Sequence, residues 1–97
     1  MISVTLARRY ARALLDLSVR QKDLPETQES LQGVAALFRG DSRVRRFFET
    51  PNLSRTEKED FLERQLKPRL SRPAYGLVRL LLRRRRLDHL VAISDEF

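Results

Sequence analysis

"SVTLARRYARALLDL", residues 3–17, is a predicted α-helix with an unusually wide apolar surface. On a helical wheel of about 100° per residue, its apolar side chains fill an arc of roughly 200°, whereas an ordinary core-facing stripe needs roughly 100° or somewhat more. The arc contains Leu6, Ala7, Tyr10, Ala11, Ala13, Leu14, Leu15 and Leu17. Two explanations are open: neighbouring helices cover this helix on several sides, or part of its apolar surface contacts a partner.

A second stretch, "AYGLVRLLL" at residues 74–82, has the same excess of apolar surface, with an arc of roughly 220°. Two such helices are difficult to bury within 97 residues, because a domain of this size has a small interior. The pattern favours two helices that lie side by side and form a groove for an amphipathic partner helix. The small residues Ala7, Ala11 and Gly76 favour a close approach of helices. Gly76 costs a helix about 1 kcal/mol relative to Ala, so it calls for a packing reason.

Short breaks separate the remaining segments of helical periodicity. After the first helix, the second begins at Pro25, because proline suits the first turn of a helix, and it stops at Gly40. Asp41 is the predicted N-cap of a short third helix.

The fourth, fifth and sixth helices have recognisable start signals. Ser54 and Glu57 have the spacing of a capping box, which opens the fourth helix. Ser71 is the predicted cap of a fifth helix over about residues 72–86, and Asp88 is the predicted cap of a sixth.

The predicted fold class is all-α, a compact bundle of about six helices in a single domain, residues 1–97. No segment alternates convincingly with the period of two typical of strands, and no Asn-Gly or Asp-Gly hairpin turn occurs. The sequence has no run of about 18 apolar residues, no signal-peptide core and no cysteine. Its net charge of +7 favours an acidic partner.

Motifs for catalysis or metal binding are missing from the sequence. The one histidine, His89, lies beside Asp88 and is interpreted as a surface or capping-turn residue, because no second His and no Cys complete a metal site. Acidic residues 57–63 are interpreted as a solvated helix face with ion pairs such as Asp60–Arg64, since no apolar surroundings are expected to shift their pKa values. No phosphate-binding glycine loop or nucleophile elbow occurs. We therefore expect no enzyme activity and no cofactor.

Three segments resemble the N-terminal domain of the F-type ATP synthase delta subunit, the counterpart of the mitochondrial oligomycin-sensitivity-conferring protein. "ARRYARALLDLS" is similar to the family's opening helix. "RVRRFFETPNLSRTEKEDFL" looks like its short helix, turn and Lys-containing helix, with Thr50 where Asn is common. "LVRLLLRRRRLDHLVAISDEF" is similar to its fifth and sixth helices. The order and spacing of these segments carry the resemblance, since no single motif is diagnostic.

The resemblance implies a six-helix domain at the top of the catalytic head, where it binds N-terminal helical segments of the alpha subunits. In the family, the groove for one such segment lies between the first and fifth helices, the two with excess apolar surface here. The partner-binding residues that this implies are Tyr10, Ala11 and Leu14 on one wall and Gly76, Arg79, Leu80 and Arg83 on the other.

The implied role is a non-catalytic stator component that attaches the head to the peripheral stalk while the rotor turns. It needs no cofactor, metal or small-molecule substrate, and it reaches the membrane only through the complex, at the cytoplasmic face of the bacterial inner membrane. Family members continue into a further domain that contacts the b subunits of the peripheral stalk. We expect that domain to be absent from this chain, which ends within the sixth helix.

Two alternatives are open. The charge of +7 and the run Arg83–Arg86 are compatible with a small basic RNA-binding domain, although aromatic residues do not interleave with the arginines. A solvated helix end is the simpler interpretation of that run. The two apolar helices are also compatible with a bundle that associates with itself.

Overall fold

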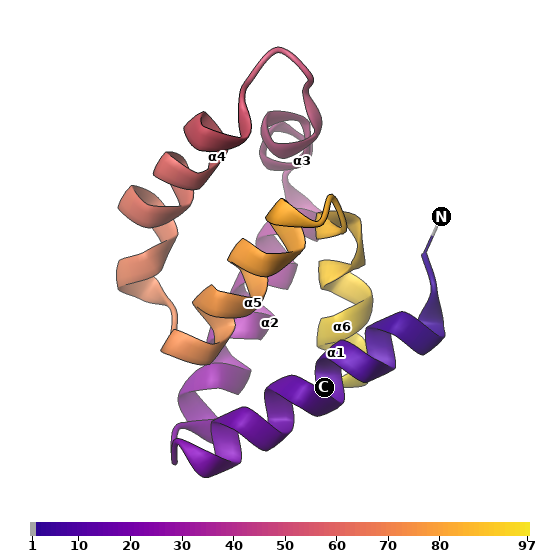
Figure 1. The fold of residues 1–97 in the computed structure, drawn as a ribbon, viewed down its shortest axis with the longest axis vertical. Helices are drawn as coiled ribbons and strands as arrows, with labels where there is room; N and C mark the ends of the chain where they lie inside the picture. Colours follow the sequence, from indigo (N-terminus) through magenta and orange to yellow (C-terminus); the bar gives the residue numbers. More distant parts are fainter. Residues whose placement is uncertain (1) are drawn as a thin grey trace.

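The structure is a computed structural model, and it describes residues 2–97. Six α-helices and no strands occur in this part of the chain, so the predicted all-α bundle is confirmed (Figure 1). The helices are α1 (Val4–Arg20), α2 (Leu24–Gly40), α3 (Ser42–Glu49), α4 (Arg55–Phe61), α5 (Arg72–Arg83) and α6 (Leu90–Glu96). A π-helical turn η1 (Leu62–Leu66) and two 3-10 turns, η2 (Lys67–Arg69) and η3 (Leu87–His89), complete the fold.

The predicted caps of three helices are confirmed by side-chain hydrogen bonds. Asp41 accepts from the backbone N–H of Arg43 at 2.9 Å, and Ser71 accepts from that of Ala74 at 3.3 Å. Ser54 and Glu57 form a complete capping box, in which each side chain accepts from the backbone N–H of the other residue. These bonds satisfy N–H groups that have no partner inside the helix.

The fifth helix is shorter than predicted, because it ends at Arg83 rather than Arg86. Arg85 has a φ of 56°, the left-handed conformation that ends many helices. The N–H of Arg86 then donates to the carbonyl of Leu81 at 2.8 Å, and that of Arg85 donates to Leu82 at 3.2 Å. These two bonds are the Schellman pattern, usually built around glycine.

The end of α1 has the same geometry. Lys22 has a φ of 58°, and the N–H of Asp23 donates to the carbonyl of Ser18 at 3.0 Å. Gly40, by contrast, lacks the left-handed conformation and is simply the last residue of α2.

The segment after α4 departs from regular α-helix over η1 and η2. In η1 the N–H of Lys67 donates to the carbonyl of Leu62, five residues back. Pro68 follows, and its ring excludes a regular α-helical turn at this point. The predicted ion pair Asp60–Arg64 does not form within residues 2–97, because Arg64 Nε instead donates to the backbone oxygen of Asp60 at 3.4 Å.

One prediction for the start of the sixth helix is wrong, because Asp88 lies inside η3 rather than at the N-cap. The N-cap is His89, which confirms its predicted place in a capping turn. His89 does not lie on the surface, however, since only 6% of its surface is exposed. Its Nε2 accepts from the backbone N–H of Ser3 at 3.1 Å, and its Nδ1 is 3.0 Å from Asp88 Oδ1. The imidazole therefore ties the start of α1 to the start of α6.

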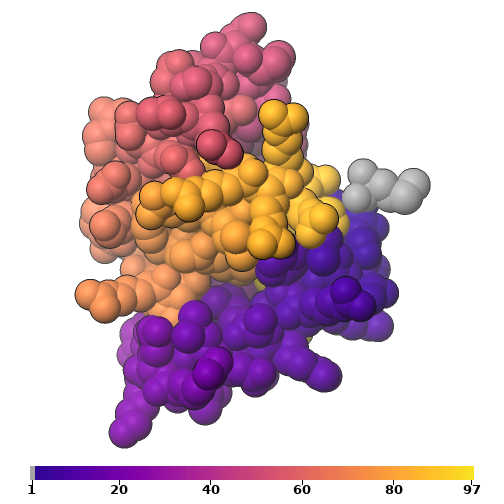
Figure 2. All heavy atoms as spheres, viewed as in Figure 1, coloured from indigo at the N-terminus to yellow at the C-terminus, as the bar shows by residue number. Residues whose placement is uncertain are grey.

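The helices pack in an order that places α1 and α5 on one face. α5 lies between α4 and α1, α2 lies behind α5, and α6 lies behind α1 and packs against both α1 and α2 (Figure 1). Figure 2 shows α4, α5 and α1 side by side on the face turned to the viewer. Ion pairs join Arg8 of α1 to Glu96 and Arg39 of α2 to Asp95, so α6 is held from both sides. A cluster of phenylalanine rings connects α2, α3 and α4, formed by Phe38, Phe47, Phe48 and Phe61.

Candidate docking surfaces on the first helix

The core uses only a narrow stripe of α1. Its buried residues are Ala7, Ala11, Leu14 and Ser18, and none of them has more than 4% of its surface exposed. These positions follow the spacing of one helix face. Much of the wide apolar arc therefore lies outside the core, on two flanks of the same helix.

The first of these, called the Tyr10 flank, consists of Leu6, Tyr10, Ala13 and Leu17. The intervals of four, three and four residues place these side chains in one row. Leu17 is 36% exposed and Ala13 is exposed, whereas Leu6 and Tyr10 are half-buried. Tyr10 Oη lies 3.5 Å from Arg86 Nη1, which donates to it, so this flank faces the end of α5.

The neighbouring surface of α5 presents Gly76, Arg79, Leu80 and Arg83, all of them exposed. Leu80 is 37% exposed, an unusual position for a large apolar side chain. A Cβ added at Gly76 would have no neighbouring atom within 4 Å, so nothing within the domain requires a glycine there.

Arg79 and Arg83 turn toward α4 rather than α1. Arg83 Nε is 2.8 Å from Glu59 Oε1. The hydrogen bond from Arg83 lowers the pKa of Glu59, partial burial opposes this change, and the positive charges of Arg83 and Arg79 lower the pKa further. The exposed surface of α5 is therefore charged beside α4 and apolar at Leu80.

The structure brings only part of the predicted partner-binding set together at the surface. Ala11 and Leu14 lie in the core rather than on the surface shared by α1 and α5. Tyr10, Gly76 and Leu80 reach the surface, and Arg79 and Arg83 form its edge along α4. The expected set omitted Ala13 and Leu17. Their helical spacing from Tyr10 was the available signal, but a wheel alone does not distinguish the core side of a wide apolar arc from its flanks.

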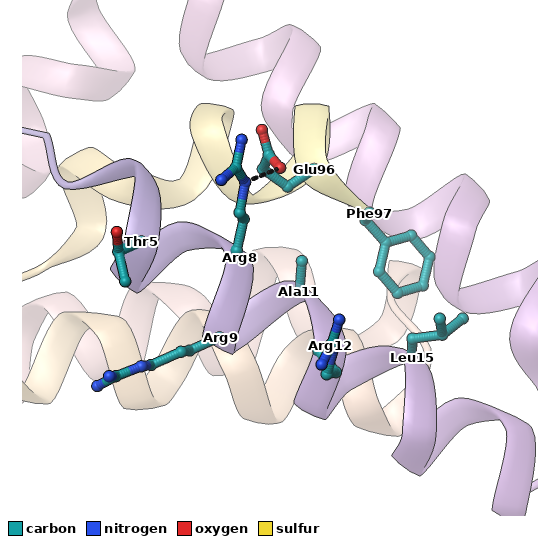
Figure 3. A pocket seen from close by; sticks show the side chains of 8 residues that line it. All are labelled: Thr5, Arg8, Arg9, Ala11, Arg12, Leu15, Glu96 and Phe97. Atoms are coloured by element: carbon teal, nitrogen blue, oxygen red, sulfur yellow. Dashed lines mark hydrogen bonds and ion pairs between the residues drawn. The ribbon is translucent and has the colours of Figure 1, made fainter.

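The second flank of α1 borders an open cavity of about 480 Å³ between α1 and α6 (Figure 3). The contributions of α1 are Thr5, Arg8, Arg9, Ala11, Arg12 and Leu15. Glu96 and Phe97 close the opposite side. In Figure 3, Arg8 points toward Glu96, with Nε and Oε1 2.9 Å apart, while Phe97 and Leu15 lie at the same end of the cavity.

Within residues 2–97, no group of His, Cys, Asp and Glu side chains is arranged to hold a metal ion. In the same part of the chain, no helix combines the length and the apolar character that crossing a membrane requires. Both surfaces instead combine exposed apolar side chains with arginines, which is typical of sites that bind polypeptide segments.

Comparison with known proteins gives one consistent result. Residues 6–97 match the family described as ATP synthase delta (OSCP) subunit. The ATP synthase subunit delta of Syntrophus aciditrophicus is 31% identical over 98 aligned residues, which cover 100% of this chain and 54% of that protein. The ATP synthase subunit delta of Anaeromyxobacter sp. Fw109-5 is 35% identical over 98 residues, which cover 100% of this chain and 55% of that protein. That of Desulfitobacterium hafniense is 30% identical over 97 residues, which cover 100% of this chain and 54% of that protein. The chain thus spans about half the length of the curated relatives it matches.

Proposed function

Because the chain belongs to the ATP synthase delta (OSCP) subunit family, we propose that it binds an N-terminal helical segment of an alpha subunit between α1 and α5. It acts as the N-terminal helical domain of a delta subunit and as a non-catalytic part of the stator. The bound segment fixes the domain to the catalytic head, which must stay still while the rotor turns. The binding itself requires no cofactor.

The observation that carries this proposal is the row of exposed apolar side chains on the Tyr10 flank beside Leu80. An amphipathic helix binds a groove by burying its apolar face, and anchors at intervals of three and four residues suit such a ligand. Ala13 and Leu17 on α1 and Leu80 on α5 are exposed, and Tyr10 between the two helices is half-buried. These are the positions where an incoming helix gains apolar contact without displacing the core.

Gly76 supports the same site. It places a backbone without a side chain on the exposed surface of α5, and nothing else in the domain approaches it. A bound helix at this point has room for close contact. Arg79 at the edge adds a positive charge that suits acidic residues on the bound segment.

The remaining parts of the role belong to the longer protein. We propose that a further domain of the longer protein contacts the b subunits of the peripheral stalk. The assembled complex then places the domain at the cytoplasmic face of the bacterial inner membrane, as a peripheral component.

An NMR titration of the isotope-labelled chain with a synthetic peptide from the N-terminus of the alpha subunit tests the site. We expect resonance shifts on the Tyr10 flank and along the exposed surface of α5.

Leu80→Asp places a charge in the apolar contact, and we expect it to abolish binding while the spectrum stays that of a folded bundle. Tyr10→Ala is expected to weaken binding by about 1–3 kcal/mol, as removal of an aromatic anchor does.

Leu37→Asp is the matched control for Leu80→Asp. Leu37 is 39% exposed on α2 and lies outside both surfaces of α1, so this variant should bind the peptide normally. Equal loss of binding in both variants would contradict a specific groove. No shifts with the peptide, combined with shifts around Arg83–Arg86 on adding RNA, would instead favour nucleic-acid binding with its strong dependence on salt.

A further inference from the structure

We propose that the cavity between α1 and α6 is a second docking site, which binds an acidic helical segment of a partner protein. This site uses the flank of α1 opposite the Tyr10 flank, and it does not depend on what binds there. Its ligand inserts a large apolar side chain between Leu15 and Phe97 and places carboxylates beside Arg12.

The apolar part of the cavity is suited to one inserted side chain. Ala11 is 4% exposed and lies at the base, while Leu15 is 38% exposed and Phe97 is half-buried at one end (Figure 3). The volume of about 480 Å³ lies within the range of roughly 300–1,000 Å³ found for ligand pockets. Because the cavity is open, a side chain carried by a helix can enter it without any movement of α1 or α6.

The charge of the cavity selects an acidic ligand. Three arginines of α1 line it, and Glu96 carries the single side-chain carboxylate among the lining residues. Glu96 pairs with Arg8 at 2.9 Å, which leaves Arg9 and Arg12 without an ion pair within residues 2–97. Figure 3 shows Arg9 extended away from the other labelled side chains, so Arg12 is the cation best placed beside the opening.

A polypeptide fits these features better than a nucleic acid. Single-stranded nucleic acids bind through aromatic platforms on which successive bases stack, whereas Phe97 is the only aromatic side chain in the lining. An amphipathic helix avoids this difficulty, because one apolar residue fills the cavity and neighbouring Asp or Glu side chains contact Arg12.

The two flanks of α1 are able to act at the same time. The Tyr10 flank faces the end of α5 through the contact between Tyr10 and Arg86, and the second flank faces α6 through the pair Arg8–Glu96. The buried stripe of Ala7, Ala11 and Leu14 lies between the two flanks. A single helix thus offers two separate positions for partner segments.

The experiment is an NMR titration of the labelled 97-residue chain with a short designed helical peptide, blocked at both ends. The peptide carries Phe and Leu one turn apart on one face, with Glu residues beside them. We expect shifts at Arg12, Leu15 and Phe97. Arg12→Glu should weaken binding about tenfold or more, because it replaces attraction by repulsion at the opening.

Arg46→Glu is the matched control, since it makes the same charge change at an exposed site on α3. Equal weakening by both variants would reduce the binding to general charge attraction and overturn the proposal. It would also be overturned if no shifts occur, if they fall on the Tyr10 flank alone, or if an RNA oligonucleotide shifts the same residues more strongly than the peptide. Binding that persists in Leu80→Asp would show that this site is separate from the one between α1 and α5.

Discussion

At the scale of single residues, Lys22 and Arg85 hold a backbone conformation that favours glycine. Both have positive φ values, 58° and 56°, at the ends of α1 and α5. A side chain in this region costs roughly 1–2 kcal/mol through contact between its Cβ and the backbone. The hydrogen bonds of the two Schellman motifs compensate for that cost by satisfying carbonyls at the helix ends.

We therefore predict that Arg85→Gly stabilises the domain. Removing the Cβ relieves the strain, and the expected gain in the free energy of unfolding is about 0.5–1 kcal/mol after the larger chain entropy of glycine is included. Urea denaturation followed by circular dichroism measures this change.

Arg84→Gly is the control for this prediction. Arg84 has a φ of −91°, which any residue adopts, so glycine brings only its entropy cost there and should destabilise the domain. If Arg85→Gly were no more stable than Arg84→Gly, strain at residue 85 would not contribute to stability.

His89 and the two positive-φ residues show why some features at the residue scale could not be predicted from the sequence. Schellman turns are recognised by glycine, and neither Lys22 nor Arg85 provides that signal. The burial of His89 depends on Ser3, which is 86 residues away, and no local pattern reports such a contact. Caps at Asp41, Ser54 and Ser71 were predictable, because their bonds form within two or three residues.

At the scale of elements, the number, order and approximate bounds of the helices follow from apolar spacing and caps. The sequence did not predict the π-helical turn η1, where the helix widens to a hydrogen bond between residues five apart before Pro68. It also did not predict which side of the apolar arc of α1 enters the core, because that depends on where α5 and α6 pack. For this reason, the expected partner-binding set includes Ala11 and Leu14, which lie in the core.

Gly76 and Gly33 offer a test at this scale, since both are helical glycines with no atom within 4 Å of an added Cβ. Replacing either by Ala should stabilise its helix by about 1 kcal/mol. We predict that only Gly76→Ala weakens binding of the alpha-subunit peptide, because the new methyl group occupies space at the groove. Thermal unfolding and isothermal titration calorimetry measure the two effects.

Gly33 lies within α2, away from the groove, and provides the comparison. Unchanged affinity in Gly76→Ala would show that the bound helix does not approach α5 at this position. Lower affinity in Gly33→Ala as well would show that helix stability, rather than contact, controls binding.

At the scale of the whole molecule, the helices form one compact body. The radius of gyration is 12.6 Å, against about 12.5 Å for a globular chain of this length. α6 is central to it despite its seven residues, because Leu90 and Ile93 are completely buried and α1 and α2 both pack on it.

We predict that Ile93→Ala lowers the free energy of unfolding by about 2–4 kcal/mol while the single cooperative transition remains. For a domain of this size, each kcal/mol corresponds to a change in the melting temperature of about 4–8 °C. Differential scanning calorimetry measures both quantities.

Leu37→Ala is the matched control at an exposed position and should change the melting temperature little. A small effect of Ile93→Ala would mean that α6 is not part of the cooperative core.

The bond between Ser3 and His89 has a consequence for synthesis on the ribosome. α1 is made before the other five helices described, yet it packs along α6, and its N-cap residue Ser3 bonds to a residue made 86 positions later. Contacts between such distant residues form late, because the intervening chain must already be in place. α1 therefore emerges from the exit tunnel with both flanks and its core stripe unprotected, and it finds its final neighbours only after His89 has left the tunnel. Until then, a helix with a wide apolar arc is a natural target for chaperones that hold nascent chains.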